Sequence, residues 1–295
     1  MYYRRKILLS LLEVFDNELE KIRLQKLLLL FTQKQETPAY DFVPYKFGCF
    51  SFHANADLHT MIKYKQVSKQ KKKWVRTEKK SWLNELKPQD RKTLFELKKE
   101  FGDKSVHELL EITYKNYPYY AINSTILDDV LGKEDKKKVA AHLDEQPKKP
   151  CLFTIGYEGI SLEAYMNKLI RNGVKALVDV RKNAMSMKYG FNKSQLKKAC
   201  EGVGIQYIHF SEVGIKSSKR KELNTQDDYD RLFEDYKQTV LPKTQETQED
   251  IVDVIKKYNR VALTCFEAES CQCHRRPLAE FLIKNQELNL ELTHL

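Results

Sequence analysis

The sequence has no long hydrophobic run, and this absence limits the class of protein. Its richest apolar stretch, Leu24 to Phe31, is interrupted by Gln25 and Lys26, whereas a transmembrane helix needs about 20 apolar residues in succession. A membrane span and a membrane partner are therefore not expected. With 41% hydrophobic and 32% charged residues among 295, the chain is neither fibrous nor wholly disordered, and it is long enough for two globular domains.

A secretion signal is also missing. The basic and apolar first residues are followed by Glu13, Asp16, Glu18 and Glu20 without a small-residue cleavage site, so we expect a first helix rather than a signal peptide. Three of the six cysteines lie within residues 265–273. In a chain of this length, that clustering favours a cytoplasmic protein with reactive, metal-binding or buried thiols over a set of three disulfides.

Acidic residues are scarce in one segment of the first half. Residues 63–80 hold nine basic residues and a single acid, which accounts for most of the net charge of +11. This density attracts polyanions, and the tryptophans within and beside it suit stacking with nucleobases. We expect DNA or RNA to bind through Lys69, Lys71, Lys72, Lys73, Trp74, Arg76, Lys79 and Lys80. A solvated lysine-rich loop and an acidic protein partner are the two alternatives.

Hydrophobic spacing predicts that the first half is mostly helical. The expected helices span residues 3–17, 20–31, 53–65, 88 onward and 106–117. A short strand and turn are expected within residues 40–51, and a hairpin or wing in the basic segment. This order resembles a winged-helix arrangement. The runs Arg23–Phe31 and Tyr45–Ser51 also resemble the core of the Panacea (SocA-like) domains.

A boundary follows the helical region. Residues 132–150 end in the sequence Pro-Lys-Lys-Pro, which is typical of a linker between domains. We therefore predict a helical, winged-helix-like basic domain over residues 1–131, a linker over residues 132–150, and a second domain over residues 151–295.

Strand and helix patterns alternate in the second half. Short apolar runs predict strands at residues 151–155, 174–180, 205–210 and 261–265. Helical patterns follow each strand, and the last covers residues 277–285. This alternation predicts an α/β fold, with a mainly parallel, Rossmann-like sheet in three layers and helices on both faces.

Polar residues follow each predicted strand, where the site of such a sheet is expected. They are Tyr157 and Glu158, then Asp179 and Arg181, then His209 and Glu212, and finally Cys265, Glu267, Cys273, His274, Arg275 and Arg276. Because the carboxyl ends of parallel strands meet at one edge, we expect most of these side chains to share a site.

Four blocks of sequence in this half place glycine, polar or charged residues at or near the predicted strands. They are Thr154-Ile-Gly-Tyr-Glu-Gly159, Asp179-Val-Arg181, Gly204-Ile-Gln-Tyr207 with Val213-Gly-Ile215, and Leu263-Thr-Cys-Phe-Glu267 with Cys273-His-Arg275. The set resembles the motifs of the domain-of-unknown-function family DUF488 and covers residues 151–285. The resemblance implies an α/β domain without a settled reaction. It implies a site made of Asp179, Arg181, Cys265, Glu267, Cys273, His274 and Arg275.

These residue types allow more than one chemistry. Cys265 is a nucleophile if cationic neighbours lower its pKa, and otherwise a metal ligand or a residue that only lines the site. Carboxylates suit acid–base catalysis or a divalent metal, although a salt bridge to Arg181 is the alternative for Asp179. The sequence leaves the cofactor open, with a divalent metal as one option. Zinc is disfavoured because the adjacent Cys273 and His274 are expected to diverge and no second ligand pair exists.

The leading hypothesis is an enzyme that hydrolyses an N-glycosidic or phosphate bond in a nucleotide or nucleic acid, in DNA repair or phage defence. Its predicted catalytic residues are Asp179, Cys265, Glu267 and His274. Its predicted residues for binding an anionic substrate are Tyr157, Glu158, Arg181, Cys273, Arg275 and Arg276. The alternative is a non-enzymatic nucleic-acid-binding regulator or antitoxin-like protein, whose α/β domain senses a small anionic ligand.

Overall fold

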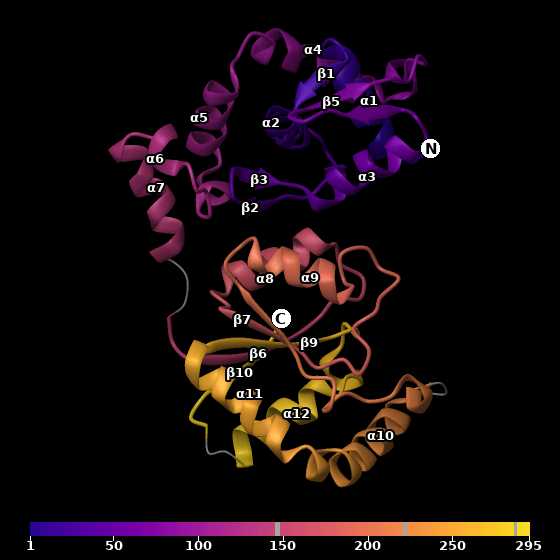
Figure 1. Cartoon of the computed structure of the whole chain (residues 1–295), viewed down its shortest axis with the longest axis vertical. Coiled ribbons are helices and arrows are strands. Elements are labelled where there is room, and N and C mark those ends of the chain that lie inside the picture. Colours follow the sequence, from indigo (N-terminus) through magenta and orange to yellow (C-terminus); the bar gives the residue numbers. More distant parts are fainter. Residues whose placement is uncertain (145–147, 221–222, 286–287) are drawn as a thin grey trace. The chain divides into compact units, whose positions relative to one another are not determined.

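A computed structural model describes residues 1–144, 148–220, 223–285 and 288–295. The chain divides into two compact units, Met1–Glu145 and Gln146–Leu295, which Figure 1 shows in indigo to magenta and in pink to yellow. Within the described ranges, no helix combines the length and the apolarity needed to cross a membrane.

The first unit is mainly helical. Its helices are α1 (Tyr3–Val14), α2 (Lys21–Thr32), α3 (Phe52–Lys63), α4 (Pro88–Phe101), α5 (Val106–Asn116), α6 (Leu127–Val130) and α7 (Lys133–Asp144). Its strands are β1 (Glu18–Glu20), β2 (Val43–Tyr45), β3 (Gly48–Phe50), β4 (Val67–Lys69) and β5 (Lys73–Arg76).

The first two helices form the centre of this unit. The side chains of α1 are buried from Ile7 to Leu12, and those of α2 are buried from Leu24 to Thr32. Helix α2 is therefore enclosed by protein around its whole circumference, which explains why its sequence is a nearly unbroken apolar run rather than an amphipathic stripe.

Two small antiparallel sheets accompany the helices. Strands β2 and β3 form a hairpin, and the other sheet has the order β1-β5-β4. The basic segment forms the β4–β5 hairpin, whose Trp74 lies opposite Leu19 and is only 2% exposed. Trp74 belongs to the core and does not offer a face to a nucleobase, so the expectation that it stacks with nucleic acid is wrong.

The segment predicted as a linker contains a helix of the first unit. Residues 133–144 form α7, whose Val139 is 1% exposed in a cluster with Leu110 and Tyr114 of α5. A linker starting at residue 132 is therefore too long. Because lysine and acidic residues dominate this helix, its single inward-facing valine gives a weak hydrophobic signal.

The second unit is an α/β domain. Its strands are β6 (Cys151–Gly156), β7 (Ala176–Asp179), β8 (Gln206–His209), β9 (Arg260–Cys265) and β10 (Glu291–His294). Its helices are α8 (Leu162–Arg171), α9 (Lys193–Glu201), α10 (Gln226–Thr239), α11 (Gln245–Tyr258) and α12 (Arg275–Asn285).

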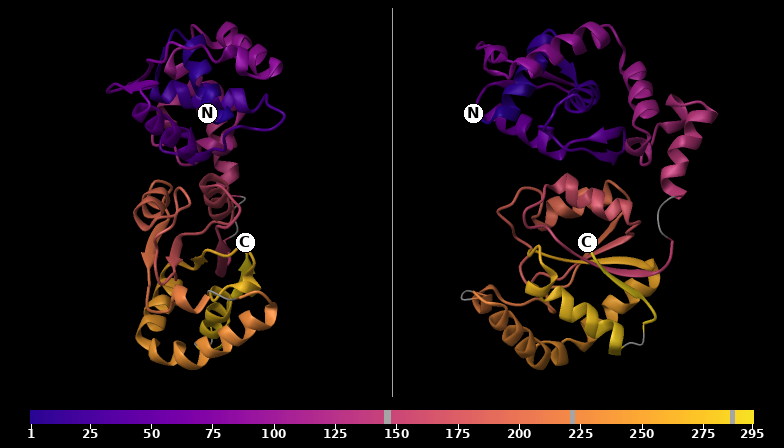
Figure 2. Two further views of the ribbon diagram at one scale, coloured as in Figure 1. Left: turned by 90° about the vertical axis from the view of Figure 1, so that its right-hand side faces the viewer. Right: turned by 180° about the vertical axis from the view of Figure 1, so that it is seen from behind.

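The five strands form one parallel sheet in the order β10-β6-β9-β7-β8. Helices α8 and α9 cover one face, and α10, α11 and α12 cover the other, as Figures 1 and 2 show. Every residue of the three central strands β6, β9 and β7 is buried, as expected for strands with helices on both sides. The predicted three-layer α/β fold is confirmed.

Because this sheet and its helices enclose a hydrophobic core of their own, we expect residues 148–295 to fold without the first unit. The isolated segment should unfold in urea as a single cooperative transition, followed by circular dichroism and by tyrosine fluorescence. Transitions that differ between the two probes, or an aggregated product, would show that the fold of this segment depends on the first unit.

Candidate functional site

A pocket of about 500 Å³ lies at the carboxyl ends of the central strands of the second unit; we call it the sheet-edge pocket. Its lining comes from the residues after β6, β7, β8 and β9 and from the turn before α12. The size is typical of small-molecule sites, and the position is where α/β sheets bind ligands.

Neighbouring strands bring the polar groups of the site together. Strands β7 and β9 are parallel, with Asp179 beside Thr264. Val180 and Arg181 therefore leave the sheet next to Cys265, the last residue of β9. The next residues along the chain, up to His274, return to this edge before α12 begins.

Cys265 and His274 form the centre of the pocket floor. The Sγ atom of Cys265 lies 3.7 Å from Nδ1 of His274, and Nε2 of His274 lies 2.9 Å from the carbonyl oxygen of Val180. A carbonyl only accepts hydrogen bonds, so Nε2 carries the proton and Nδ1 is the acceptor nitrogen that lies beside the thiol. The Val180 carbonyl thereby fixes the orientation of the His274 ring next to Cys265.

A second thiol and a cation complete the cluster. The Sγ atom of Cys273 lies 3.9 Å from the same Nδ1 atom, and a guanidinium nitrogen of Arg220 lies 2.7 Å from it. Burial acts to raise the pKa of Cys265. The hydrogen bond from the Cys273 thiol, the contact with His274 and the charge of Arg220 outweigh burial and hold the pKa of Cys265 well below its usual value.

The two cysteines have opposite roles in this cluster. Burial and the neighbouring Cys265 raise the pKa of Cys273 well above its ordinary value. In this pair the Cys273 thiol is the donor and Cys265 the acceptor, so negative charge is favoured on Cys265. Because thiolates are the reactive form of cysteine, Cys265 has the character of a nucleophile.

Glu267 lies beside this cluster and pairs with Arg220. Its Oε2 atom is buried and has no hydrogen-bond partner among the described residues. A buried carboxylate oxygen without a donor is costly. At the wall of a pocket, this oxygen is available to accept a proton or a hydrogen bond from a ligand.

Asp179, which the sequence analysis placed among the catalytic residues, lies below the pocket and is fully buried. Its Oδ1 atom accepts hydrogen bonds from the backbone nitrogen and Nε of Arg181, at 3.1 and 2.8 Å. Its Oδ2 atom accepts from Arg181 and from the Tyr207 hydroxyl, at 2.5 and 2.6 Å. Both oxygens are occupied, so Asp179 positions Arg181 and does not contact a substrate.

Arg181 lines the pocket and is held from three sides. Besides its bonds to Asp179, it donates to the Tyr157 hydroxyl at 2.8 Å and to the Phe191 carbonyl at 2.9 Å. Burial acts to lower the pKa of Arg181, but the bonds to Asp179 outweigh it and raise the pKa. Arg181 is therefore a fixed positive charge.

Three other predicted residues have structural roles. Arg275 is 1% exposed and donates to the carbonyl oxygens of Glu267 and Ala268, which fixes the turn after β9. Glu158 accepts from the backbone nitrogen of Ala268 at 3.1 Å. Arg276 pairs with Glu280 along the surface of α12. None of the three lines the sheet-edge pocket.

The cations that do line the pocket, besides Arg181, are Lys182, Lys188 and Arg220. Lys188 donates to the Tyr157 carbonyl at 2.6 Å, and burial lowers the pKa of Lys188. Arg220 ends the short 3-10 helix Ser217–Arg220 after β8. The sequence signal for Arg220 is the basic run that starts at Lys216, which the sequence analysis did not connect with the site.

The expectation that Cys273 and His274 diverge is wrong. Their ligand atoms and that of Cys265 all lie within 4.8 Å of one another, a separation compatible with one tetrahedral metal ion. Arg220, however, already places a positive charge at Nδ1 of His274. A cation bound there would have to displace Arg220, so the arrangement favours a thiolate stabilised by arginine.

The predicted nucleic-acid-binding residues of the first unit separate into two groups. Lys73 pairs with Glu18, Arg76 with Glu13, and Lys80 with Glu85. Lys69, Lys71, Lys72 and Lys79 are exposed. The exposed lysines are those available to phosphates.

The second unit is thus a three-layer α/β domain with a thiol-containing, cation-lined site at its sheet edge. Residues 161–282 of this unit match the family described as Domain of unknown function DUF488, which confirms the resemblance of the sequence motifs to that family. No curated protein and no solved structure gives a significant match to the chain.

The ion pair below the pocket gives a test of stability. Replacing Asp179 with Asn leaves the buried guanidinium of Arg181 without its counter-charge, which should lower the free energy of unfolding by about 3 kcal/mol or more. The matched substitution at the exposed Asp253 should change it by less than about 0.5 kcal/mol. Urea denaturation measures both. Equal effects at the two positions would contradict the role given to Asp179.

Proposed function

We propose that the second unit is an enzyme that acts on the phosphate group of a nucleotide or nucleic acid through a thiolate nucleophile, Cys265. One observation carries this proposal. Cys265 lies at the floor of a pocket beside His274, which the Val180 carbonyl orients and which contacts the cation Arg220. The cations around that pocket, Arg181, Lys182, Lys188 and Arg220, suit an anionic substrate.

The chemistry follows from the positions of these groups. The Cys265 thiolate attacks the phosphorus atom of a phosphoester, forming an S–P bond while the P–O bond to the leaving group breaks. The leaving oxygen takes a proton from solvent. Water then attacks the phosphorus atom, the S–P bond breaks, and phosphate and the thiolate are released. Glu267, whose Oε2 atom has no hydrogen-bond partner among the described residues, accepts the proton of that water and returns it to solvent.

Carboxylate-pair hydrolysis of an N-glycosidic bond has less support. It requires two carboxyl groups that reach the substrate from opposite sides. Asp179 is saturated by Arg181 and Tyr207, and Glu158 is bonded to the turn at Ala268 outside the pocket. Glu267 alone is left, so the thiol route is the better-supported one.

A specific observation also supports nucleic-acid binding by the first unit. Its elements follow the order helix, strand, two helices, two strands, with the hairpin β2–β3 inserted before α3. In the sheet order β1-β5-β4, the basic β4–β5 hairpin supplies the last two strands of this series of elements, and β4 is an outer strand of the sheet. We propose a winged-helix-like module whose wing, the β4–β5 hairpin, contacts phosphates.

The state of Cys265 can be tested by alkylation. An ordinary thiol has a pKa near 8.5 and loses about tenfold in reactivity per pH unit below it. The pKa of Cys265 is held well below that range. The rate of its alkylation by iodoacetamide should therefore change little from pH 9 down to the lowered pKa of Cys265. Because the charge of Arg220 is one of the causes that lower this pKa, Arg220→Met should make alkylation of Cys265 fall more steeply as the pH decreases. Peptide mass spectrometry follows each cysteine separately.

The same assay separates the enzyme from the anion-sensing regulator. Inorganic phosphate and nucleotides should protect Cys265, and the control variant Cys271→Ser should behave as the unchanged protein, since Cys271 does not line the pocket. Release of phosphate that is lost in Cys265→Ser, with a phosphoryl adduct on Cys265, supports the enzyme. Protection by anions without turnover of nucleotides or oligonucleotides supports the regulator instead.

The wing can be tested by charge reversal. Replacing Lys71 and Lys72 with Glu should weaken binding to duplex DNA and reduce the slope of log affinity against log salt by about 1.8, since two phosphate contacts are lost. The double replacement of the exposed Lys92 and Lys99 of α4 changes the net charge equally and should leave the slope unchanged. Equal effects of the two pairs would indicate attraction by net charge alone.

A further inference from the structure

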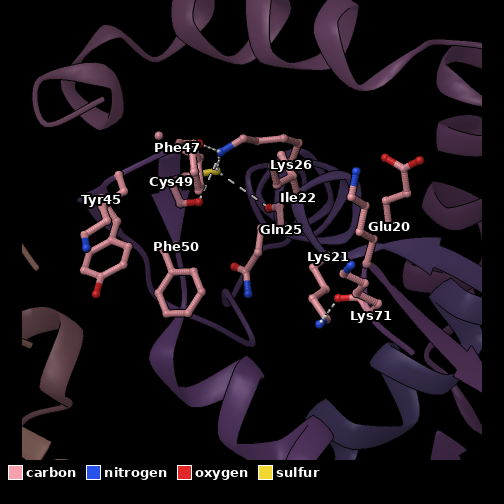
Figure 3. A pocket seen from close by; sticks show the side chains of 13 residues that line it. Glu20, Lys21, Ile22, Gln25, Lys26, Tyr45, Phe47, Cys49, Phe50 and Lys71 are labelled. Carbon is pink, nitrogen blue, oxygen red and sulfur yellow. Dashed lines mark hydrogen bonds between the residues drawn. The ribbon is translucent and has the colours of Figure 1, made fainter. Parts of the chain in front are cut away.

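A second pocket, of about 520 Å³, lies within the first unit and has no role in the thiol chemistry. Figure 3 shows it between the start of α2, the β2–β3 hairpin and the tip of the β4–β5 hairpin. We call it the hairpin pocket. Its volume is in the range of sites that bind small molecules or single side groups of a polymer.

Aromatic rings supplied by the β2–β3 hairpin form one wall. The rings of Tyr45 and Phe50 are stacked, with centroids 5.1 Å apart and an angle of 26° between their planes. Phe47, at the turn between the two strands, is 45% exposed. An exposed aromatic wall of this kind offers flat faces to a planar ligand.

The floor of the pocket is held rigidly by Lys26. This lysine is 1% exposed, and its Nζ atom donates to the carbonyl oxygens of Phe47 and Cys49 and to the Cys49 thiol. Gly48 between them has a φ of +81°, and a Cβ there would lie 2.4 Å from the ring of Tyr114. The turn that carries Phe47 therefore has one conformation, and the wall is formed before a ligand arrives.

Lysines surround the opening. Lys21 starts α2, Lys46 lies in the β2–β3 turn, and Lys71 and Lys72 lie at the tip of the β4–β5 hairpin. Glu20 is the one acid among the lining residues. Lys21 donates to the Lys71 carbonyl at 2.7 Å, which ties the hairpin tip to the start of α2. The lining thus combines an aromatic wall with a positive rim.

We propose that the hairpin pocket binds single-stranded nucleic acid, with one base against the rings of Phe47 and Phe50 and the adjacent phosphates at Lys71 and Lys72. The proposal deepens the nucleic-acid binding proposed for the first unit and rests on it. It is supported by the combination of ring faces with lysines, which matches the stacking and phosphate pairing that bind single strands. It is also supported by the continuity of the pocket rim with the exposed lysines of the wing.

Duplex DNA does not fit this pocket, because its bases are stacked inside the helix. An acidic peptide would meet the same lysines but would not use the ring faces in the same way. Stacking on Phe47 and Phe50 therefore distinguishes the proposed ligand from both.

The test compares the binding of three probes by fluorescence anisotropy. They are a labelled oligothymidylate of about 16 nucleotides, a duplex of the same length and a labelled polyglutamate peptide. Phe50→Leu and Phe47→Leu keep an apolar side chain and remove the flat ring. Phe95→Leu, at a 52% exposed phenylalanine on α4, is the matched control. Thermal unfolding verifies that each variant is folded. Because Phe47 is exposed, its replacement should affect the stability of the fold less than that of Phe50.

We expect Phe47→Leu and Phe50→Leu to bind the oligothymidylate about tenfold more weakly, with duplex binding and the Phe95→Leu variant unchanged. If both variants bind it as tightly as the unchanged protein while Lys71 and Lys72 reversal weakens binding, the wing functions without the pocket and this inference is wrong. If polyglutamate binds as tightly as the oligothymidylate, the ligand class is wrong. If the unchanged protein binds neither nucleic acid, the proposed function of the first unit fails as well.

Discussion

The arrangement of the sheet-edge pocket depends on the burial of one carboxylate, Asp179, at the end of the second strand of the α/β unit. A buried charge must be paired and hydrogen-bonded on every side. Arg181 supplies most of these bonds and Tyr207 supplies the rest. The strand end and the loop after it thereby have one conformation, and the reacting groups are built on this support.

The loop that Asp179 and Arg181 hold in place contacts two histidines from other parts of the second unit. The backbone between Asp179 and Arg181 presents the Val180 carbonyl, which fixes the proton of His274 on Nε2. On the other side, His209 contacts the carbonyl oxygen of Arg181 at 2.8 Å, so the third strand is tied to the same loop. A residue that never contacts the pocket thus sets which nitrogen of His274 faces the thiol.

The thiolate raises a second electrostatic problem, since a negative charge at a buried sulfur is unfavourable without compensation. Two kinds of group compensate for it. Cys273 donates a hydrogen bond, and Arg220 brings a positive charge that is itself balanced by Glu267. The net arrangement stabilises the charged form of the thiol, while one oxygen of Glu267 has no hydrogen-bond partner among the described residues and several cations line the pocket.

Sequence patterns predicted the sheet, its parallel strands and the edge at which the polar residues gather, because alternating strand and helix periods and strand-end positions are local signals. They did not predict β10, which is only four residues long. They also misassigned Asp179 and Arg275, because a buried structural charge and a catalytic charge look alike in a sequence. Arg220 was missed because its position depends on how the loop after β8 folds back.

The two units use positive charge in different chemical forms, and this difference bears on what each binds. Around the sheet-edge pocket, Arg181 and Arg220 are held in place by carboxylates, so their charges are directional and suited to one phosphate in a defined orientation. Around the hairpin pocket and the wing, most of the positive charges are lysines, of which Lys46, Lys71 and Lys72 are exposed. Lysines act as mobile point charges that tolerate many phosphate positions, which suits a polymer. Under the proposed function, the fixed arginines bind the one reacting phosphate and the lysine surface binds a chain of phosphates.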